Sequence, residues 1–462
     1  MFVVTLPASA EKRPQEFAQK VKNAAPVGAR HALPLLEIRG DRTPDVAAFD
    51  SPLPLVISPR GTGSILLKKL KPSFVDLEIG ENVEIPAGVT VIRSFHDHEK
   101  TPTIAELQKT VTALLTTKPD IIKIATMIRS YDDLQRLNAL HEQIPSSQKR
   151  VILGMGPKAH LNRMLSPLKN ALTYTFIEEG EASAPGQVPL SLHLLTAHCK
   201  TPKIFGILGG EQVSESFSPV IHNTLFGRHG IDAVYSVFPT EDLREAWTAL
   251  TAMNAAGFSV TSPFKESIIP FLDELEDEAA AIGSVNTVIK KGSRYVGSNT
   301  DIAGLRSGYD WKGITSVAIL GSGGVVPAVI ACCHAEKISD ITIFSRNAAK
   351  RTQLVEKWNV KAEPLEKFPE SRADRIICAI SENVDIDLPP PVPGASALDL
   401  RYSASRFLVH ATRAGYATHD GLPMLLHQAL EQFRIFTGVS AVAEELDIVL
   451  PMHSSFPLSY GL

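Results

Sequence analysis

Residues 316–333, SVAILGSGGVVPAVIACC, place an apolar run before a glycine-rich turn and a second apolar run after it. This order predicts a strand, a tight turn and a helix, the start of a dinucleotide-binding fold. Gly321 and Gly323 match the first two glycines of GxGxxG, although the third position is Val326. Many strand–helix turns carry glycines, so the prediction depends on this context. Because glycines let the backbone approach a pyrophosphate, we predict that Gly321, Gly323 and Gly324 bind a dinucleotide.

The next apolar run, within ITIFSRNAAKR (341–351), indicates which dinucleotide is bound. An acidic residue at the end of this strand would bind the ribose hydroxyls of NAD, and the sequence has none there. It carries four other polar residues: Ser345, Arg346, Asn347 and Lys350. Cationic side chains suit the 2′-phosphate of NADP, which we therefore predict as the cofactor. The alternative is a basic helix start that faces solvent.

The whole chain has the composition of a folded protein of two or three domains, since its 462 residues exceed one ordinary core. Hydrophobic residues make up 44%, charged residues 21%, and the formal net charge is -4. This balance does not favour a nucleic-acid partner, and no apolar run reaches the roughly 18–20 residues that span a bilayer. The four cysteines lack metal-ligand spacing, so no metal site is predicted. Few cysteines and a start without signal-peptide character predict a cytoplasmic protein.

The N-terminal part contains eight apolar, β-rich runs: FVVTL (2–6), ALPLLEI (32–38), LPLVISP (53–59), SFVDLEI (73–79), VTVIRSF (89–95), DIIKIAT (120–126), RVILGMG (150–156) and LTYTFIE (172–178). Helical patterns such as TIAELQKTVTALL (103–115) separate the later ones. Strands buried on both faces read as continuous apolar runs, so eight such units predict a (β/α)8 barrel. An open parallel sheet is the alternative. We expect a barrel over 1–199 and a linker at AHCKTPK (197–203).

Polar residues follow the C-terminal ends of these runs, where a barrel carries its active site. They are Glu37, Arg39, Arg60, Asp76, Glu78, His96 and Lys123. Lys123 lies among apolar residues, where an ammonium is poorly hydrated and the nucleophilic amine is favoured. Such a lysine forms imines with ketones, and His96 could then take a proton from the adjacent carbon. The alternatives are a lysine paired with a carboxylate and a histidine in a polar turn.

Six segments resemble the type I 3-dehydroquinate dehydratases, in the same order: LLEIRGD (35–41), SPRG (58–61), VDLEI (75–79), SFHDHEKTP (94–102), DIIKIATM (120–127) and ASAPGQ (182–187). The resemblance implies Lys123 as the Schiff-base lysine and His96 as the general acid/base. It also implies six residues around the substrate: Glu37, Arg39, Arg60, Arg163, Ser183 and Gln187. In that family an acidic residue usually follows the arginine of SPRG by four positions, where this chain has Ser64.

Lys265 and Asp301 form a second constellation, in GFSVTSPFKES (257–267) and GSNTDIAG (297–304). Reduction of a ketone needs a proton donor near the developing alkoxide and a partner that orients it. A lysine–aspartate pair supplies both groups. The alternative is a turn lysine that only faces solvent.

These segments belong to an ordered set that resembles the shikimate dehydrogenases: ESFSPVIHN (215–223), VTSPFK (260–265), GSVNT (283–287), NTD (299–301), GSGG (321–324), SR (345–346) and GLPMLLHQALEQF (421–433). The resemblance implies Lys265 and Asp301 as the catalytic pair. The other implied substrate contacts are Ser216, Ser218, Thr261, Asn286, Tyr402 and Gln428. The chain departs from the usual pattern at Glu215, Ser259, Ser345, Asn347 and Cys378.

The predicted fold is therefore α/β throughout: the barrel, then a shikimate-dehydrogenase-like module. That module is expected to contain a substrate domain over 203–303, completed by C-terminal helices in 424–462, and a Rossmann-type NADP domain over 304–423. The C-terminal helices are expected at MLLHQALEQFRIFTG (424–438) and SAVAEELDIVL (440–450).

Together, the two resemblances imply consecutive reactions on small molecules. The first domain would dehydrate 3-dehydroquinate to 3-dehydroshikimate, and the second would reduce that product to shikimate with NADPH. Two alternatives stay open: an enzyme directed to quinate, and a non-catalytic metabolite-binding regulator built from the same domains. The sequence predicts no oligomeric state.

Overall fold

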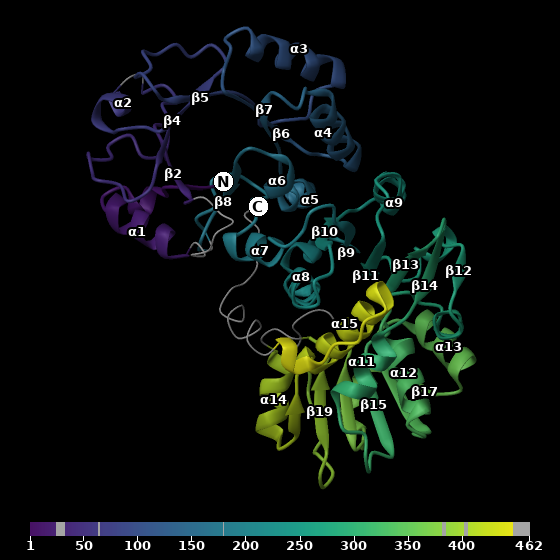
Figure 1. The fold of residues 1–462 in the computed structure, drawn as a ribbon. Helices are drawn as coiled ribbons and strands as arrows, with labels where there is room; N and C mark the ends of the chain where they lie inside the picture. The colour runs from purple at the N-terminus through teal and green to yellow at the C-terminus, as the bar shows by residue number, and fades with distance from the viewer. Residues whose placement is uncertain (25–32, 63–64, 179, 381–384, 402–404, 447–462) are drawn as a thin grey trace. The chain divides into compact units, whose positions relative to one another are not determined.

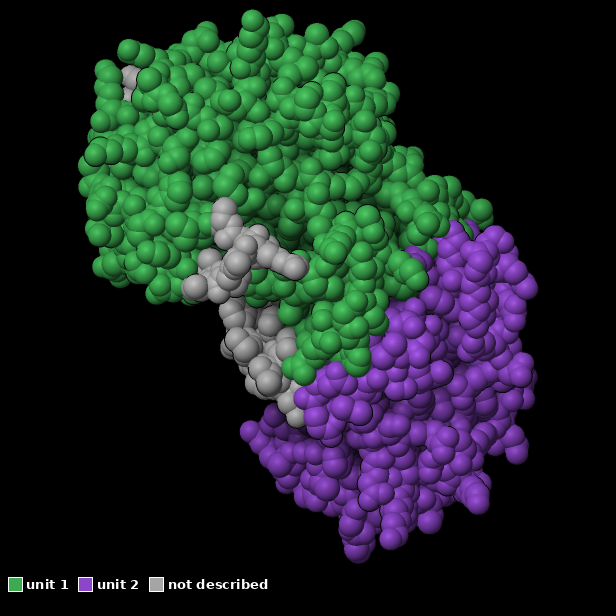
Figure 2. Space-filling view, in the orientation of Figure 1, with its two compact units in different colours: residues 1–255, 449–462 green, residues 256–448 purple. Residues whose placement is uncertain are grey.

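The computed structural model describes residues 1–24, 33–62, 65–178, 180–380, 385–401 and 405–446. The chain divides into two compact units, residues 1–255 and residues 256–448, coloured separately in Figure 2. This division falls inside the predicted substrate domain, so the predicted domain boundaries stay predictions. Within the described ranges, no helix is long and apolar enough to cross a membrane.

Unit 1 begins with a parallel barrel of eight strands, drawn in purple to teal in Figure 1. The strands are β1 (Phe2–Thr5), β2 (Leu35–Arg39), β3 (Leu55–Ser58), β4 (Phe74–Glu78), β5 (Thr90–Asp97), β6 (Ile121–Met127), β7 (Lys149–Met155) and β8 (Thr173–Thr175). Their order is β7-β6-β5-β4-β3-β2-β1-β8. Each of the eight predicted runs overlaps one strand, which confirms a nearly closed barrel. The open-sheet alternative is wrong.

Short helices follow most of the barrel strands. They are α1 (Pro14–Ala24), α2 (Ile65–Lys69), α3 (Ile104–Leu115), α4 (Tyr131–Gln143), α5 (His160–Met164), α6 (Ser166–Lys169) and α7 (Leu190–Leu195). Capping boxes start α3 and α4: Thr103 exchanges hydrogen bonds with Glu106, and Ser130 with Asp133. These caps define where each helix begins beyond β5 and β6, and they keep the strand ends free to carry functional side chains.

Unit 1 continues beyond the barrel with β9 (Lys203–Gly209), α8 (Ser218–Arg228), β10 (Ala233–Pro239) and α9 (Leu243–Ala252). Strands β9 and β10 pair in parallel. The predicted linker is held against this layer, because the backbone N–H groups of Lys200 and Thr201 both donate to the Asp232 carboxylate over 3.0 Å. The neighbouring Cys199 is buried. The segment is therefore packed structure, not a free tether.

The barrel packs directly against this added layer within unit 1. Tyr131, the first residue of α4, is buried, and its hydroxyl donates to the carbonyl of Pro239 over 3.0 Å. The backbone N–H of Tyr131 donates to the Glu245 carboxylate of α9. Gln135 donates from Nε2 to the carbonyl of Ala249 over 2.8 Å. The helix that follows β6 is thus hydrogen-bonded to elements outside the barrel.

Two histidines are buried near this contact. His160 of α5 lies 2.8 Å by Nδ1 from the Ser236 hydroxyl of β10, and His193 of α7 packs beside the ring of Phe2. Their side chains are almost entirely inaccessible to solvent. Burial lowers the pKa of each imidazole from its ordinary 6.5 to about 3.

We expect unit 1 to lose stability as the pH falls below about 6.5. There the unfolded chain protonates both histidines, whereas the folded chain keeps them neutral until about pH 3. Stability is therefore fully present above 6.5 and declines by about 1.4 kcal/mol per pH unit for each group. Urea unfolding of the whole chain at several pH values, followed by circular dichroism, measures this slope. His193→Leu should make the slope shallower by roughly one group's share; an unchanged slope would contradict the assignment.

Unit 2 opens with a small mixed sheet. Its elements are β11 (Gly257–Val260), β12 (Glu274–Leu275), α10 (Asp277–Ile282), β13 (Thr287–Lys291), β14 (Arg294–Ser298) and α11 (Asp301–Gly308). Strand β13 pairs antiparallel with both β11 and β14, and β12 pairs parallel with β14. Lys265 follows β11 and Asp301 follows β14, so the predicted lysine and aspartate lie in the same unit.

The rest of unit 2 is a six-stranded parallel sheet. Its strands are β15 (Ser316–Leu320), β16 (Asp340–Ser345), β17 (Lys361–Pro364), β18 (Arg375–Cys378), β19 (Ser396–Asp399) and β20 (Ala417–His419), and its helices are α12 (Val326–Ala335), α13 (Ala348–Trp358), α14 (Arg406–Ala414) and α15 (Leu422–Thr437). The order β17-β16-β15-β18-β19-β20 reverses beside β15, as in Rossmann folds. The Rossmann-type prediction is confirmed.

The chain's last described elements match the prediction in part. Helix α15 covers most of the expected helix at 424–438 and ends at Gly438, which has a left-handed backbone conformation. Of the second expected helix, 440–450, residues 440–442 are not helical, Ala443–Leu446 form a single 3-10 turn, and 447–450 lie outside the described residues. Two hydrogen bonds close this turn. The backbone N–H of Glu445 donates to the Val442 carbonyl, and the backbone N–H of Val442 donates to the Glu445 carboxylate.

Candidate active sites

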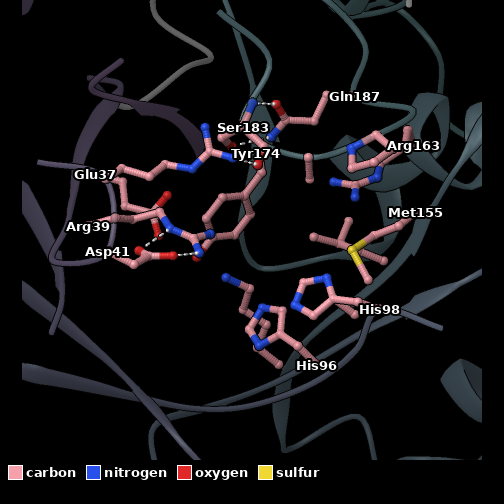
Figure 3. A pocket seen from close by; sticks show the side chains of 16 residues that line it. Glu37, Arg39, Asp41, His96, His98, Met155, Arg163, Tyr174, Ser183 and Gln187 are labelled. Carbon is pink, nitrogen blue, oxygen red and sulfur yellow. Dashed lines mark hydrogen bonds and ion pairs between the residues drawn. The ribbon is translucent and has the colours of Figure 1, made fainter. Parts of the chain in front are cut away.

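A cavity of about 270 Å³ lies in the barrel and is lined by most of the residues that the sequence predicted there (Figure 3). Its predicted lining residues are Glu37, Arg39, His96, Lys123, Arg163, Ser183 and Gln187. Arg60 is not among the lining residues, but it contacts the same charged cluster, described below. The structure thus gathers side chains from strands far apart in sequence around one pocket, as a barrel active site requires.

Lys123 of β6 is buried at 4% exposure and bonded to a carboxylate. Its Nζ donates to Asp76 Oδ2 of β4 over 2.8 Å and lies 3.9 Å from the ring centroid of Tyr174. The sequence left open a catalytic lysine or a lysine paired with a carboxylate. The structure shows the pairing, and the amine also lines the cavity, while the catalytic role stays a prediction. A cation over an aromatic face is attracted by the ring, so two groups hold Nζ in place.

Asp76 is the centre of a buried charge cluster. Besides Lys123, it contacts Arg60 Nη2 at 3.2 Å, and it accepts a hydrogen bond from Ser94 Oγ over 2.5 Å. Burial opposes ionisation of Asp76, but the charges of Lys123 and Arg60 hold the pKa of its carboxyl far below the ordinary value. Asp76 is therefore an anion between two cations.

His96 of β5 is paired with a second carboxylate of β4. Its Nδ1 lies 2.5 Å from Glu78 Oε2, and its backbone N–H donates to Glu78 Oε1 over 2.9 Å. Burial and the charge of Lys123 lower the pKa of His96 below its ordinary value, although the contact with Glu78 acts in the opposite direction. His96 is thus favoured in its neutral form, which can accept a proton near neutral pH.

Glu37, Ser183 and Gln187 form one hydrogen-bonded wall of the cavity. Thr5 Oγ1 lies 2.6 Å from Glu37 Oε2 and 3.1 Å from Ser183 Oγ. Gln187 accepts from the Ser183 backbone N–H over 2.6 Å and donates to its hydroxyl over 3.0 Å. Each side chain is fixed by the others, so this wall is pre-organised for polar contacts with a ligand.

The two predicted arginines of the cavity have different partners. Arg39 forms a bidentate pair with Asp41, at 3.0 and 2.7 Å. Arg163 donates from Nε to the carbonyl of Gly154, and burial lowers its pKa to about 10. In the described part of the chain no carboxylate pairs with Arg163, so its guanidinium is available for an anionic ligand.

Several lining residues were not predicted as site residues: Asp41, Arg42, His98 and Tyr174. Tyr174 lies within the eighth predicted run, and His98 lies two residues beyond His96. Alternation of side chains with a period of two residues along a strand was the sequence signal that could have identified both residues. The departure at Ser64 lies outside the described residues.

Unit 2 contains the second predicted cluster. Lys265, in the turn after β11, donates from Nζ to Asp301 Oδ2 over 2.6 Å. Asp301 Oδ1 accepts from Asn286 Nδ2 over 2.8 Å, and the same amide nitrogen lies 3.2 Å from Gln428 Oε1. Four predicted residues from four segments thus meet at one place. The solvent-facing alternative for Lys265 is wrong, since its side chain is 15% exposed and paired.

Close packing of two helices positions this cluster. Asp301 is the first residue of α11, and Gln428 lies on α15. A Cβ atom at Gly304 would come within 2.8 Å of the Met424 carbonyl and 2.9 Å of the Gln428 Cβ. Only glycine allows α11 and α15 to approach so closely, and this approach brings the amide of Gln428 to the Asn286 side chain.

The remaining predicted substrate residues are not in this cluster. Ser216 and Ser218 belong to unit 1, where both are buried and their hydroxyls lie 3.1 Å apart. Thr261 is half-buried in the turn that leads to Lys265. Tyr402 lies outside the described residues. The roles assigned to these residues stay predictions.

The glycine turn after β15 fits a dinucleotide. Gly321 has φ +110°, and a Cβ there would lie 3.0 Å from the Ala379 carbonyl of the adjacent strand end. No atom lies within 4 Å of a Cβ built at Gly324, so the turn presents open backbone at the point where the strand order reverses. Val326, where the third glycine of the pattern would stand, begins α12 and is fully buried.

The end of β16 fits a phosphorylated ribose. Ser345 Oγ lies 2.8 Å from Ser322 Oγ of the glycine turn. Asn347 caps α13, since its side chain accepts from the Lys350 backbone N–H. Arg346 and Lys350 are exposed, and no carboxylate occupies the end of the strand. The exposed cations therefore suit a phosphate better than bare ribose hydroxyls.

One segment joins the cofactor turn to the lysine–aspartate cluster within unit 2. Ser284 donates to the carbonyl of Gly324 over 3.4 Å, and Asn286, two residues on, donates to Asp301. The predicted cofactor and catalytic residues thus belong to one connected region.

Comparison with known proteins matches three family models: Type I 3-dehydroquinase over residues 64–193, the Shikimate dehydrogenase substrate binding domain over 208–288, and the Shikimate 5'-dehydrogenase C-terminal domain over 421–444. The matches follow one another along the chain in the order that the motifs predicted.

Three relatives extend these matches. The chain is 36% identical to the shikimate dehydrogenase (NADP(+)) of Pyrococcus abyssi, over 51% of this chain and 93% of that protein. It is 28% identical to the bifunctional 3-dehydroquinate dehydratase/shikimate dehydrogenase of Arabidopsis thaliana, over 82% of this chain and 70% of that protein. It is also 28% identical to the shikimate biosynthesis protein AroDE of Chlamydia muridarum, over 80% and 79% respectively. The chain therefore belongs to the shikimate dehydrogenase family and, with its type I 3-dehydroquinase domain, to the bifunctional 3-dehydroquinate dehydratase/shikimate dehydrogenases.

Proposed function

We propose that this enzyme dehydrates 3-dehydroquinate to 3-dehydroshikimate in the barrel and reduces that product to shikimate in unit 2 with NADPH. The observation that carries the proposal is that Lys123 and His96 line one cavity, while Lys265 pairs with Asp301 in the other compact unit. The test is a coupled assay in which 3-dehydroquinate and NADPH are added to the purified chain. Shikimate should form; its absence would contradict the proposal.

In the barrel, the Lys123 ammonium gives up a proton and its amine attacks the substrate ketone; the ketone oxygen leaves as water with two protons from Nζ, and a protonated imine forms. The imine withdraws electrons, so the adjacent carbon loses a proton, and the neighbouring hydroxyl group leaves as water. Hydrolysis of the imine then returns the lysine. Asp76 and the Tyr174 ring both face Lys123 Nζ, which carries the positive charge of a protonated imine. These two groups therefore stabilise that charge.

His96 acts as the general acid/base of this elimination. Its lowered pKa provides a neutral imidazole that accepts the carbon-bound proton, and the resulting imidazolium can protonate the departing hydroxyl. Arg163 binds the substrate carboxylate, because its buried guanidinium pairs with no described acidic residue. Glu37, Arg39, Ser183 and Gln187 orient the hydroxyl groups, and Arg60 keeps Asp76 ionised.

Trapping with borohydride tests the imine. Borohydride added with 3-dehydroquinate should reduce the imine to a stable amine and inactivate the dehydratase. Mass spectrometry should then locate the adduct on the peptide that contains Lys123. An adduct on another residue would contradict the assignment.

In unit 2, Lys265 supplies the proton to the developing alkoxide, and Asp301 orients its ammonium at 2.6 Å. Asn286 and Gln428 hold Asp301 and offer amide groups to the substrate hydroxyls. The resemblance to the shikimate dehydrogenases also assigns substrate contacts to Ser216, Ser218, Thr261 and Tyr402. NADPH, when bound at Gly321, Gly323 and Gly324, supplies the hydride.

Selectivity for NADP tests the role of the exposed cations. Arg346→Ala should raise the KM for NADPH by about 10- to 100-fold, as expected for loss of a charge-assisted hydrogen bond to phosphate. The KM for NADH should hardly change, since NADH has no 2′-phosphate. Lys361→Ala is the matched control, because Lys361 lies at the opposite end of the neighbouring strand. Equal losses with both cofactors would contradict the assignment.

The proposed location is the cytoplasm. All four cysteines are buried thiols without disulfides, and burial raises the pKa of Cys199, Cys333 and Cys378 to about 12. Such thiols are suited to a reducing compartment.

A further inference from the structure

Strand β4 carries two carboxylates that share contacts with Arg60 and Ser94, and each also has one contact of its own. Asp76 and Glu78 are two residues apart, so both side chains lie on the same face of the strand. Asp76 contacts Lys123 at 2.8 Å, whereas Glu78 contacts His96 at 2.5 Å. Each proposed reactive group of the barrel therefore has its own acidic residue from a single strand.

Both carboxylate oxygens of Glu78 contact His96, and Oε2 also lies 3.4 Å from Arg60 Nη1 and 3.3 Å from the Ser94 hydroxyl. Oε1 accepts the backbone N–H of His96 at 2.9 Å, and Oε2 faces the ring Nδ1 at 2.5 Å. Burial opposes ionisation, but the hydrogen bond from His96 and the charges of His96 and Arg60 lower the pKa of the Glu78 carboxyl. An ionised carboxylate can only accept hydrogen bonds, so Nδ1 must carry the proton and Nε2 the lone pair.

Glu78 acts through the histidine and not on a ligand. His96 lines the cavity, whereas Glu78 is not among the lining residues. Glu78 of β4 is the carboxylate that contacts the His96 ring.

We infer that Glu78 is a positioning residue of the dehydratase, which holds the ring of His96 and fixes the tautomer whose Nε2 accepts the proton from the substrate. This inference rests on the proposed acid/base function of His96. It assigns a function to Glu78 that is distinct from that of Asp76, which pairs with the lysine.

Three substitutions of Glu78 distinguish control of the His96 tautomer from a role of Glu78 in packing alone. In Glu78→Gln, the His96 backbone N–H still needs an oxygen acceptor, so the amide oxygen takes that place and the NH2 group faces Nδ1. The NH2 group donates, which forces the proton onto Nε2 and blocks the base. Glu78→Ala leaves the ring free to adopt either tautomer. Glu78→Asp retains the charge on a side chain shorter by one methylene.

Glutamine should therefore be worse than alanine, although it is closer to glutamate in size. We expect kcat for dehydration to fall by about 10²- to 10³-fold in Glu78→Gln, as for a histidine held in the wrong tautomer. Glu78→Ala should cost about 10-fold, and Glu78→Asp should recover part of that loss. KM should change little in all three. Nitrogen-15 NMR of the His96 ring should report the proton on Nδ1 in the unmodified chain and on Nε2 in Glu78→Gln.

Two further variants make the outcome decisive. His96→Asn tests the proposed function itself. If this variant retains dehydration, the assignment of His96 as general acid/base is contradicted. A second outcome would overturn only the inference about Glu78. It is that His96→Asn is inactive, while kcat for dehydration in Glu78→Gln equals that of the unmodified chain or exceeds that of Glu78→Ala. Glu84→Gln, at an exposed residue after the same strand, is the matched control and should retain full activity. Circular dichroism and an unchanged urea unfolding midpoint report intact folding of each variant.

Discussion

Replacing Lys123 by methionine is expected to lower dehydration of 3-dehydroquinate by at least about 10³-fold, because no other residue in the cavity lies in place to form the imine. Reduction of 3-dehydroshikimate should continue at the rate of the unmodified chain, since Lys265 and Asp301 belong to the other compact unit. The two rates are measured separately, each with its own substrate.

The buried partner of Lys123 determines the control for this experiment. Methionine leaves Asp76 with Arg60 and Ser94 but without the lysine, so a loss of activity in Lys123→Met alone could reflect a disturbed charge cluster. Lys123→Arg retains a cation beside Asp76 and cannot form the imine. Both variants should be inactive in dehydration and folded by circular dichroism. Substantial dehydration by Lys123→Arg would exclude imine catalysis.

Replacing Lys265 by methionine should have the reciprocal effect: reduction of 3-dehydroshikimate should fall by about 10²- to 10⁴-fold, the usual contribution of a general acid. Dehydration should be unaffected. The loss should appear mainly in kcat, because the proton is needed only as the alkoxide develops. Asp301→Asn should produce a smaller loss, since the ammonium remains but its orienting charge is removed.

Lys291→Met provides the matched control for Lys265→Met, because it removes an exposed lysine from a strand of the same sheet. It should retain both activities. If a folded Lys265→Met chain lost dehydration together with reduction, the model of two separate sites would be wrong.

The barrel and the proximity of His96 and Lys123 could be predicted because both depend on regularities of the sequence. Each of the eight apolar runs became a strand, and polar residues at strand ends converge wherever parallel strands share an edge. His96 and Lys123 lie on adjacent strands, and the register pairs His96 with Ala125, two residues beyond Lys123. Their proximity therefore followed from the order of the strands.

The partners of these residues could not be predicted in the same way. That Glu78 meets His96 depends on the register between β4 and β5, in which Glu78 pairs with Ser94. A shift of one residue would turn the carboxylate to the other face, and the sequence does not encode that register locally. Likewise, 197–203 has the composition of a linker, but it is anchored by Asp232, about 30 residues later in the chain. Long-range contacts of this kind leave no local pattern.

The contact between α4 and the layer beyond the barrel has a consequence for how this gene could be divided. If the coding sequence were split near residue 200 and the halves were made as separate polypeptides, the barrel half would expose Tyr131 and His160 to water. The other half would expose Pro239 and lose the partner of Glu245. The fragments are therefore expected to aggregate when made singly and to reassemble when made together.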